Sequence, residues 1–199
     1  EALTLVKLRP LRVEYQREMD VSVLFVDVAG YTSLSERHDP DRVNVMIERY
    51  FGAFLDEILR NGGDVNETAG DGLMVIFQDE DPERHARNAV QTALGILRRA
   101  DEINEARGID EPIRLHIGVN SGAAAVGATK IEGSAATRWT YTASGPVTNV
   151  AARLSALGAG DSAFIGPETA RRIVGWFDLE DLGDRELKNM EEPVRVFRL

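Results

Sequence analysis

The stretch VSVLFVDVAG, residues 21–30, decides the fold of this chain. Its apolar first part predicts a buried strand that ends at Asp27. Residues 29–33 predict a turn that opens a helix, and backbone N–H groups at a helix start suit phosphate oxygens. A carboxylate at the edge of a buried strand is costly unless a cation or hydrogen bonds compensate it. The stretch therefore predicts a core strand with a candidate ligand site at its end.

A second aspartate, Asp71, lies in the sequence AGDG at residues 69–72, just before the apolar run 73–77. Residues 65–77 predict a hairpin that turns at this point. Two carboxylates beside a phosphate-type turn suggest Mg²⁺ ions that hold a nucleoside triphosphate. A structural interpretation is equally open, in which Asp27 caps a helix and Asp71 fills a tight Asp-Gly turn.

The composition fits one domain with a substantial core. The chain has 199 residues, and 43% of them are apolar. A net charge of −10 argues against nucleic acid as a partner. The lack of cysteine excludes disulfides, thiol catalysis and cysteine-bound zinc. The apolar runs are far shorter than the roughly 20 residues that span a bilayer, so we expect a cytoplasmic domain; the sequence leaves open whether the full-length protein is membrane-tethered.

The chain divides into a short connector and one domain. Residues 1–18 alternate apolar and charged side chains and predict a connector from a missing upstream region, since the chain starts at Glu1 without a methionine. We expect that region to carry a sensor or regulatory domain. Residues 19–199 form the predicted domain.

The order of strand, helix, strand, strand, helix and strand in this domain resembles a ferredoxin-like α/β (α+β) sandwich. We expect a mostly antiparallel sheet with helices on one face, followed by a small C-terminal α/β subdomain. The predicted elements are helices near 40–60, 82–107 and 147–157, a hairpin over 112–127 that turns near Ser121-Gly122, and a loop or projecting arm at 128–140.

The predicted helix at 147–157 carries two polar residues, Asn149 and Arg153, on one face because they are four residues apart. An amide and a guanidinium on an otherwise apolar helix could face a ligand. The alternative is a solvated helix face.

Three motifs together resemble a known family. FVDVAGYT at 25–32, ETAGD at 67–71 and TASGPVTNVAARL at 142–154 closely resemble class III nucleotidyl cyclases, the catalytic domains of adenylate and guanylate cyclases. The resemblance covers about residues 20–199. It implies a phosphorus–oxygen lyase that converts ATP or GTP to the 3′,5′-cyclic nucleotide and pyrophosphate.

The resemblance also implies a site, two divalent cations (Mg²⁺ or Mn²⁺), and a homodimer with two shared active sites. The metal-binding positions are Asp27, Val28 and Asp71. The phosphate-binding positions are Ala29, Gly30, Tyr31, Thr32 and Lys188, the last of which could also be an ordinary surface lysine. Asn149 matches the asparagine that positions the ribose, and Arg153 matches the arginine that stabilises the transition state. By resemblance, the two aspartates come from one subunit, and the partner supplies Glu67, Thr142, Asn149, Arg153 and Lys188.

Glu67 and Thr142 match the two positions that choose the base, and they point in different directions. A carboxylate accepts well from the N1–H and N2–H₂ donors of guanine, so Glu67 favours GTP. Thr142 and the Gly145-Pro146 after it resemble a bacterial subclass that mostly makes cyclic AMP. An alternative for Glu67 is a hairpin surface residue that meets no base.

Other interpretations are weaker. A catalytically dead nucleotide-binding regulatory module would have lost a metal aspartate, the asparagine or the arginine, and all are present. Gly62-Gly63-Asp64 resembles the start of the GGDEF motif of diguanylate cyclases, but Val65-Asn66 follow in place of Glu-Phe. The histidines at 38, 85 and 116 share no metal-ligand spacing, and we assign them no chemistry.

Overall fold

The structure, a computed structural model, describes residues 16–69, 71–106, 112–132, 137–158 and 161–199. Most of the predicted connector, residues 1–15, lies outside the described residues. The helices and strands are, in chain order, β1 (Arg17–Val28), α1 (Tyr31–Arg37), α2 (Pro40–Arg60), β2 (Gly63–Ala69), β3 (Gly72–Phe77), α3 (Pro82–Glu105), β4 (Leu115–Glu132), β5 (Thr137–Ser144), α4 (Pro146–Ser155), β6 (Ser162–Ile165), α5 (Pro167–Arg172), β7 (Glu180–Arg185) and β8 (Val194–Arg198). No helix in the described parts of the chain combines the length and apolar character that crossing a membrane requires.

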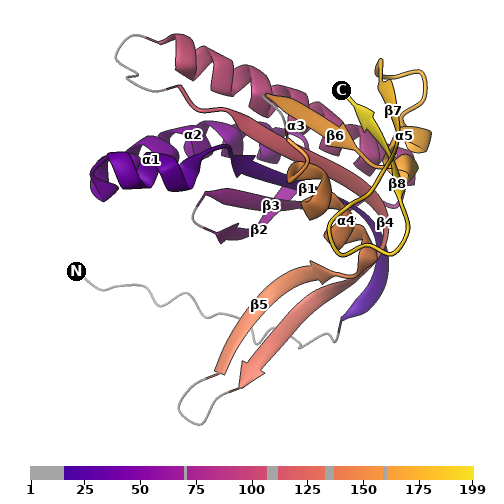
Figure 1. The fold of residues 1–199 in the computed structure, drawn as a ribbon. Coiled ribbons are helices and arrows are strands. Elements are labelled where there is room, and N and C mark those ends of the chain that lie inside the picture. Colours follow the sequence, from indigo (N-terminus) through magenta and orange to yellow (C-terminus); the bar gives the residue numbers. More distant parts are fainter. Residues whose placement is uncertain (1–15, 70, 107–111, 133–136, 159–160) are drawn as a thin grey trace.

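The described strands form one eight-stranded sheet in the order β2-β3-β1-β4-β6-β8-β7, with β5 paired to β4 (Figure 1). The pairing of β4 with β6 is parallel, and the other pairings are antiparallel. The predicted mixed α/β class with a mostly antiparallel sheet is therefore confirmed. The C-terminal strands extend this same sheet, so the C-terminal region shares its hydrogen-bonded framework.

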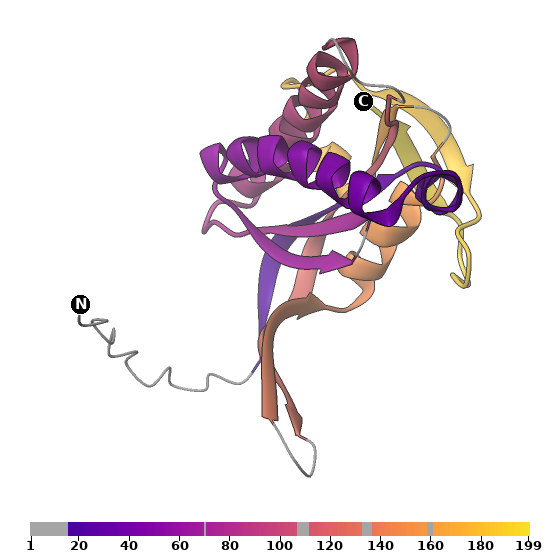
Figure 2. The ribbon, with the colours of Figure 1, turned by 90° about the vertical axis from the view of Figure 1, so that its left-hand side faces the viewer.

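Both faces of β1 are buried, and each face has its own helical cover. Leu24 and Val26 face the cluster formed with α2 and α3, whereas Val21 and Val23 belong to a second cluster with α4. Figure 2 shows α2 and α4 on opposite sides of the sheet. The expectation of helices on one face thus holds for α2 and α3 but not for α4. The physical reason is the apolar run of β1, which has no polar side to leave uncovered.

The predicted hairpin turn at Ser121-Gly122 is wrong. β4 continues through this point, and Val21 of β1 pairs with Gly122. Gly122 has a φ of 145°, which makes it a local irregularity inside β4. The long strand β1 pairs with β4 both before and after this residue. The far end of β4 pairs with β5, and the two strands project from the sheet as an arm (Figure 1).

A glycine in β4 sets how closely α4 approaches the sheet. A Cβ atom on Gly118 would lie 2.1 Å from the carbonyl oxygen of Ala151 and 2.4 Å from the amide nitrogen of Ser155, both in α4. These neighbours are backbone atoms that cannot rotate away. Gly118 therefore determines the position of the helix that carries Asn149.

A buried polar network fixes the N-terminal half of β1. The Ser22 hydroxyl lies 2.8 Å from Nδ1 of His85 in α3 and 2.6 Å from the Ser121 hydroxyl in β4. Arg172 of α5 donates two hydrogen bonds, of 2.8 and 2.9 Å, to the carboxylate of Asp20. Burial lowers the pKa of His85, which favours the neutral ring. The network joins β1 to α3, β4 and α5. Because the His85 ring is neutral, it adds no buried charge to the network.

We predict opposite effects for two glycine-to-alanine substitutions. Gly118→Ala should lower the free energy of unfolding by about 1–3 kcal/mol, because the added methyl group displaces α4. Gly52→Ala is the matched control, since a Cβ atom there meets nothing within 4 Å and Gly52 lies inside α2. It should raise the free energy of unfolding by up to about 1 kcal/mol. Urea unfolding measures both; an unchanged Gly118→Ala protein would contradict the close seating of α4.

Candidate functional site

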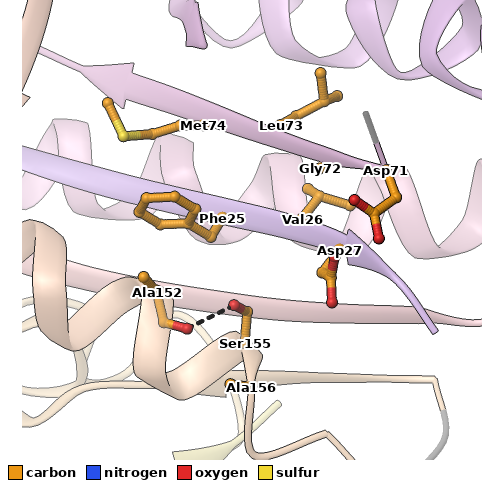
Figure 3. Close-up of a pocket in the computed structure, with 10 residues that line it drawn as sticks. All are labelled: Phe25, Val26, Asp27, Asp71, Gly72, Leu73, Met74, Ala152, Ser155 and Ala156. Carbon is orange, nitrogen blue, oxygen red and sulfur yellow. Dashed lines mark hydrogen bonds between the residues drawn. The ribbon is translucent and has the colours of Figure 1, made fainter. Parts of the chain in front are cut away.

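Asp27 and Asp71 come together at one end of a pocket. Asp27 pairs with Gly72 in the β1–β3 register, and the N–H of Val28 donates a 3.1 Å hydrogen bond to the carbonyl of Asp71. Both aspartates line a pocket of about 360 Å³. Figure 3 shows the two carboxylates at the same end of this pocket. Asp27 and Asp71 are 44 positions apart in the sequence, and the fold brings both to one pocket.

The electrostatics of this pair favour a cation. Burial raises the pKa of Asp27, and the neighbouring carboxylate of Asp71 raises it further. His116 acts in the opposite direction and lowers the pKa of Asp27. Two carboxylates that repel each other in a half-buried position are relieved when a positive charge binds between them.

The rest of the pocket is largely apolar. Phe25 and Met74 from the sheet face Ala152, Ser155 and Ala156 from the end of α4 and the residue after it (Figure 3). The Ser155 hydroxyl donates to the carbonyl of Ala152 at 2.9 Å, so it is already used within the helix. The charged groups of the pocket are therefore the two aspartates, at one end of an apolar cleft.

The donor set suits a cation that also binds substrate oxygens. The described residues contain no group of three or more His, Asp or Glu side chains arranged around a metal position. Asp27 and Asp71 supply two carboxylates, whereas Val28, the third predicted metal-binding position, follows Asp27 in β1 and does not line the pocket. Mg²⁺ is commonly held in this way, by one or two carboxylates together with water and substrate phosphates. The residues present thus fit such an ion.

The predicted phosphate-binding turn is formed by the end of β1 and the start of α1. Gly30 caps α1 in the left-handed conformation, with φ 72° and ψ 15°. The N–H of Ala29 already donates to the carbonyl of Arg114 at 2.9 Å. Tyr31 and Thr32 belong to the first turn of α1, where backbone N–H groups have no partner inside the helix. Gly30, Tyr31 and Thr32 are therefore better placed than Ala29 to offer N–H groups to a phosphate.

The remaining predicted residues lie apart from the pocket of the same chain. Asn149 is exposed and Arg153 is half-buried on successive turns of α4, and neither lines that pocket. Lys188 is exposed and follows the buried Leu187, which clusters with Val150 and Leu154 of α4. The structure thus groups Asn149, Arg153 and Lys188 around α4.

The two predicted base-reading positions lie on β2 and β5. The backbone of Glu67 pairs with Met74, a pocket-lining residue, while the side chain of Glu67 lies outside the described part of the structure. Thr142 is half-buried, and within the described residues its hydroxyl makes only a long 3.5 Å contact with the carbonyl of Ala143. The hydroxyl of Thr142 is therefore available to a ligand.

His116 is a residue that sequence reasoning missed. It pairs with Asp27 across β1 and β4, and a Cβ atom on Gly158 would meet its ring at 2.2 Å. The ring therefore lies close both to Asp27 and to Gly158 in the segment that follows α4. Only the register between two distant strands reveals this position, and spacing along the sequence carries no signal for it.

Comparison with known proteins gives a consistent result. The model of the family described as Adenylate and Guanylate cyclase catalytic domain matches residues 13–199. Adenylate cyclase 1 of Rhizobium meliloti (strain 1021) is 30% identical over 142 residues, which cover 69% of this chain and 21% of that protein. The chain thus spans about a fifth of the length of this relative.

Solved structures show the same fold. The adenylyl cyclase CyaB from P. aeruginosa matches with a TM-score of 0.85 and 25% identity, over 93% of this chain and 95% of that one. The guanylate cyclase domain of RhGC from Catenaria anguillulae matches with a TM-score of 0.79 and 24% identity, over 92% of this chain and 97% of that one. With the family match over residues 13–199, these likenesses show that the chain belongs to the adenylate and guanylate cyclase catalytic domain family.

Proposed function

We propose that this domain is a purine nucleotidyl cyclase that converts ATP or GTP to the 3′,5′-cyclic nucleotide and pyrophosphate. The observation that carries the proposal is the pair Asp27 and Asp71 at one end of an apolar pocket, beside the start of α1. Asn149 and Arg153 are also present, which argues against a catalytically dead regulatory module.

The chemistry follows from the residues in these roles. The 3′-oxygen attacks the α-phosphorus, the bond from that phosphorus to the β-phosphate oxygen breaks, and the hydroxyl proton passes to water or a phosphate. Two divalent cations, Mg²⁺ or Mn²⁺, held by Asp27, Asp71 and the Val28 backbone would acidify the hydroxyl and neutralise phosphate charge. Arg153 would meet the charge that develops on the reacting phosphate, and Asn149 would orient the ribose.

Phosphate binding completes the scheme. The N–H groups at the start of α1, from Gly30 to Thr32, would hold phosphate oxygens. Lys188 would bind the terminal phosphates as a point charge. The guanylate cyclase domain of Catenaria anguillulae, which shares the fold, is described in complex with GTP, in keeping with a triphosphate at such a site.

A homodimer would explain why the predicted residues fall into two groups. Asn149, Arg153 and Lys188 do not line the pocket that holds Asp27 and Asp71 in the same chain. A two-fold symmetric pair would place the α4 group of each subunit opposite the pocket of the other. Each dimer would then contain two equivalent composite sites.

The base preference rests on two residues that favour different purines. Glu67 can accept from two guanine donors, while Thr142 can donate or accept and so discriminates less. Matched relatives include an adenylate cyclase and a guanylate cyclase domain. We therefore propose a purine cyclase and leave ATP and GTP as equal candidates.

The first prediction concerns the metal site. Asp27→Asn and Asp71→Asn should each reduce turnover by at least about 100-fold with Mn²⁺ or Mg²⁺, because each removes a cation ligand with little change in shape. The melting temperature should be unchanged or slightly higher, since a repulsive charge is lost. Near-normal turnover in either variant would sink the two-cation scheme. A wild-type protein that binds ATP or GTP without turnover would instead support the regulatory module.

The second prediction concerns the shared site. Asp27→Ala and Arg153→Ala proteins should each be inactive alone, and their mixture should recover activity. A mixed dimer has one site that lacks both groups and one intact site, so full exchange should approach about a quarter of wild-type activity. A mixture of Asp27→Ala with Asp71→Ala is the matched control and should stay inactive, because both changes damage the same half-site. Failure of the first mixture, with subunit exchange demonstrated, would refute the composite site.

The third prediction concerns the base. Glu67→Lys should raise the ratio of kcat/KM for ATP to that for GTP by about tenfold or more, since an ammonium cannot accept from guanine. Parallel product analysis with ATP and GTP measures the ratio. A ratio that does not move would mean that Glu67 does not read the base.

A further inference from the structure

Residue Asn66, beside the proposed base-reading Glu67, sits in an irregularity of β2. The β2–β3 register runs from Val65 opposite Val75 directly to Glu67 opposite Met74. Asn66 is therefore the extra residue of a β-bulge. Bulges change the direction of the following residues and are frequent next to active sites. Here the bulge comes directly before Glu67, whose backbone pairs with Met74.

The side chain of Asn66 links two strands that are not neighbours in the sheet. Its Nδ2 group donates a hydrogen bond to the backbone carbonyl of Tyr141 in β5. Tyr141 directly precedes Thr142, the second proposed base-reading residue. β5 pairs with β4, and β2 pairs with β3. The contact therefore joins two strands, β2 and β5, whose backbones do not pair with each other. The Asn66 amide thus links the residue before Glu67 to the residue before Thr142.

A second tie reaches the same tyrosine from β3. Nε2 of Gln78, just after β3, donates to the Tyr141 hydroxyl at 3.2 Å. This bond holds the exposed tip of the side chain, whereas the Asn66 bond holds the backbone. The two ties can therefore be separated by mutation.

Asn66 also has a local energetic cost. Its Oδ1 atom is buried and has no hydrogen-bond partner among the described residues. A buried acceptor left unpaired costs on the order of 1–3 kcal/mol, which an apolar side chain at this position would avoid. The stability of the isolated chain therefore gives little reason for an asparagine at position 66. Its hydrogen bond to the Tyr141 carbonyl, which positions β5 relative to β2, gives a better reason.

We propose that Asn66 is a positioning residue for base selection, which holds Tyr141 so that Thr142 and Glu67 address the same purine. The inference rests on the proposed cyclase function and adds to it a coupling between the two base-reading strands. When the bond to Tyr141 is lost, β5 and β2 lose the side-chain contact that fixes their relative position, and Glu67 discriminates less between the bases.

A double-mutant cycle tests this coupling, because residues that share one contact network show non-additive effects. The measured quantity is the ratio of kcat/KM for ATP to that for GTP. Glu67→Lys should shift this ratio by at least fivefold less in the Asn66→Leu background than in the wild type. Gln78→Ala is the matched control, since it removes the tie to the tyrosine hydroxyl but keeps the tie to the backbone. In that background the shift caused by Glu67→Lys should be unchanged.

The outcomes separate the inference from the proposed function. An equal shift in the Asn66→Leu and wild-type backgrounds would overturn the role of Asn66 while leaving the cyclase intact. An equally reduced shift in the Gln78→Ala background would also overturn it, since general loosening of β5 would then explain both. No turnover in the wild type would overturn the cyclase proposal and this inference together. Should Asn66→Leu fail to fold, Asn66→Ser, whose shorter side chain cannot span to the carbonyl, gives the same comparison.

Discussion

The repulsion between Asp27 and Asp71 is the constraint on which the rest of the site depends. β1 lies inside the sheet with both faces covered, so Asp27, next to its last residue, is partly withdrawn from water. Burial and the second carboxylate both raise the pKa of Asp27. Such a pair is unfavourable in the free chain and becomes favourable when cations bind. The packed strands must therefore hold the two carboxylates in place before any ligand arrives, and the buried network at Asp20, Ser22 and Arg172 secures the opposite end of β1.

The sequence predicted the elements whose pattern is strong and local. α2 starts at Pro40, as the helix predicted near 40–60 requires, and the Asp39 carboxylate accepts hydrogen bonds from the N–H groups of Asp41 and Arg42. The motif positions Asp27 and Asp71 were also found, because each follows or precedes an apolar strand. In both cases the information lies within a few residues of the feature.

Predictions from the sequence were wrong or missing where contacts between distant segments determine the structure. Gly122 resembles a turn residue, but the length of β1 on the other side of the pairing keeps β4 extended. α4 lies on the face opposite α2 and α3, which its own periodicity does not specify. His116 reaches Asp27 only through the β1–β4 register, and Asn66 meets Tyr141 across 75 positions of sequence. Local patterns do not encode these pairings, so a single sequence cannot supply them.

The distribution of charge gives a physical reason for the proposed sharing of the site between two subunits. The chain carries a net charge of −10, and its pocket presents two carboxylates, so a triphosphate would be repelled without cations. The basic residues assigned to the phosphates, Arg153 and Lys188, belong to the α4 side of the chain. In the proposed dimer, Arg153 and Lys188 of one subunit would bring positive charge to the acidic pocket of the other. Each half-site would then be incomplete alone, so that catalysis would depend on how the two subunits meet.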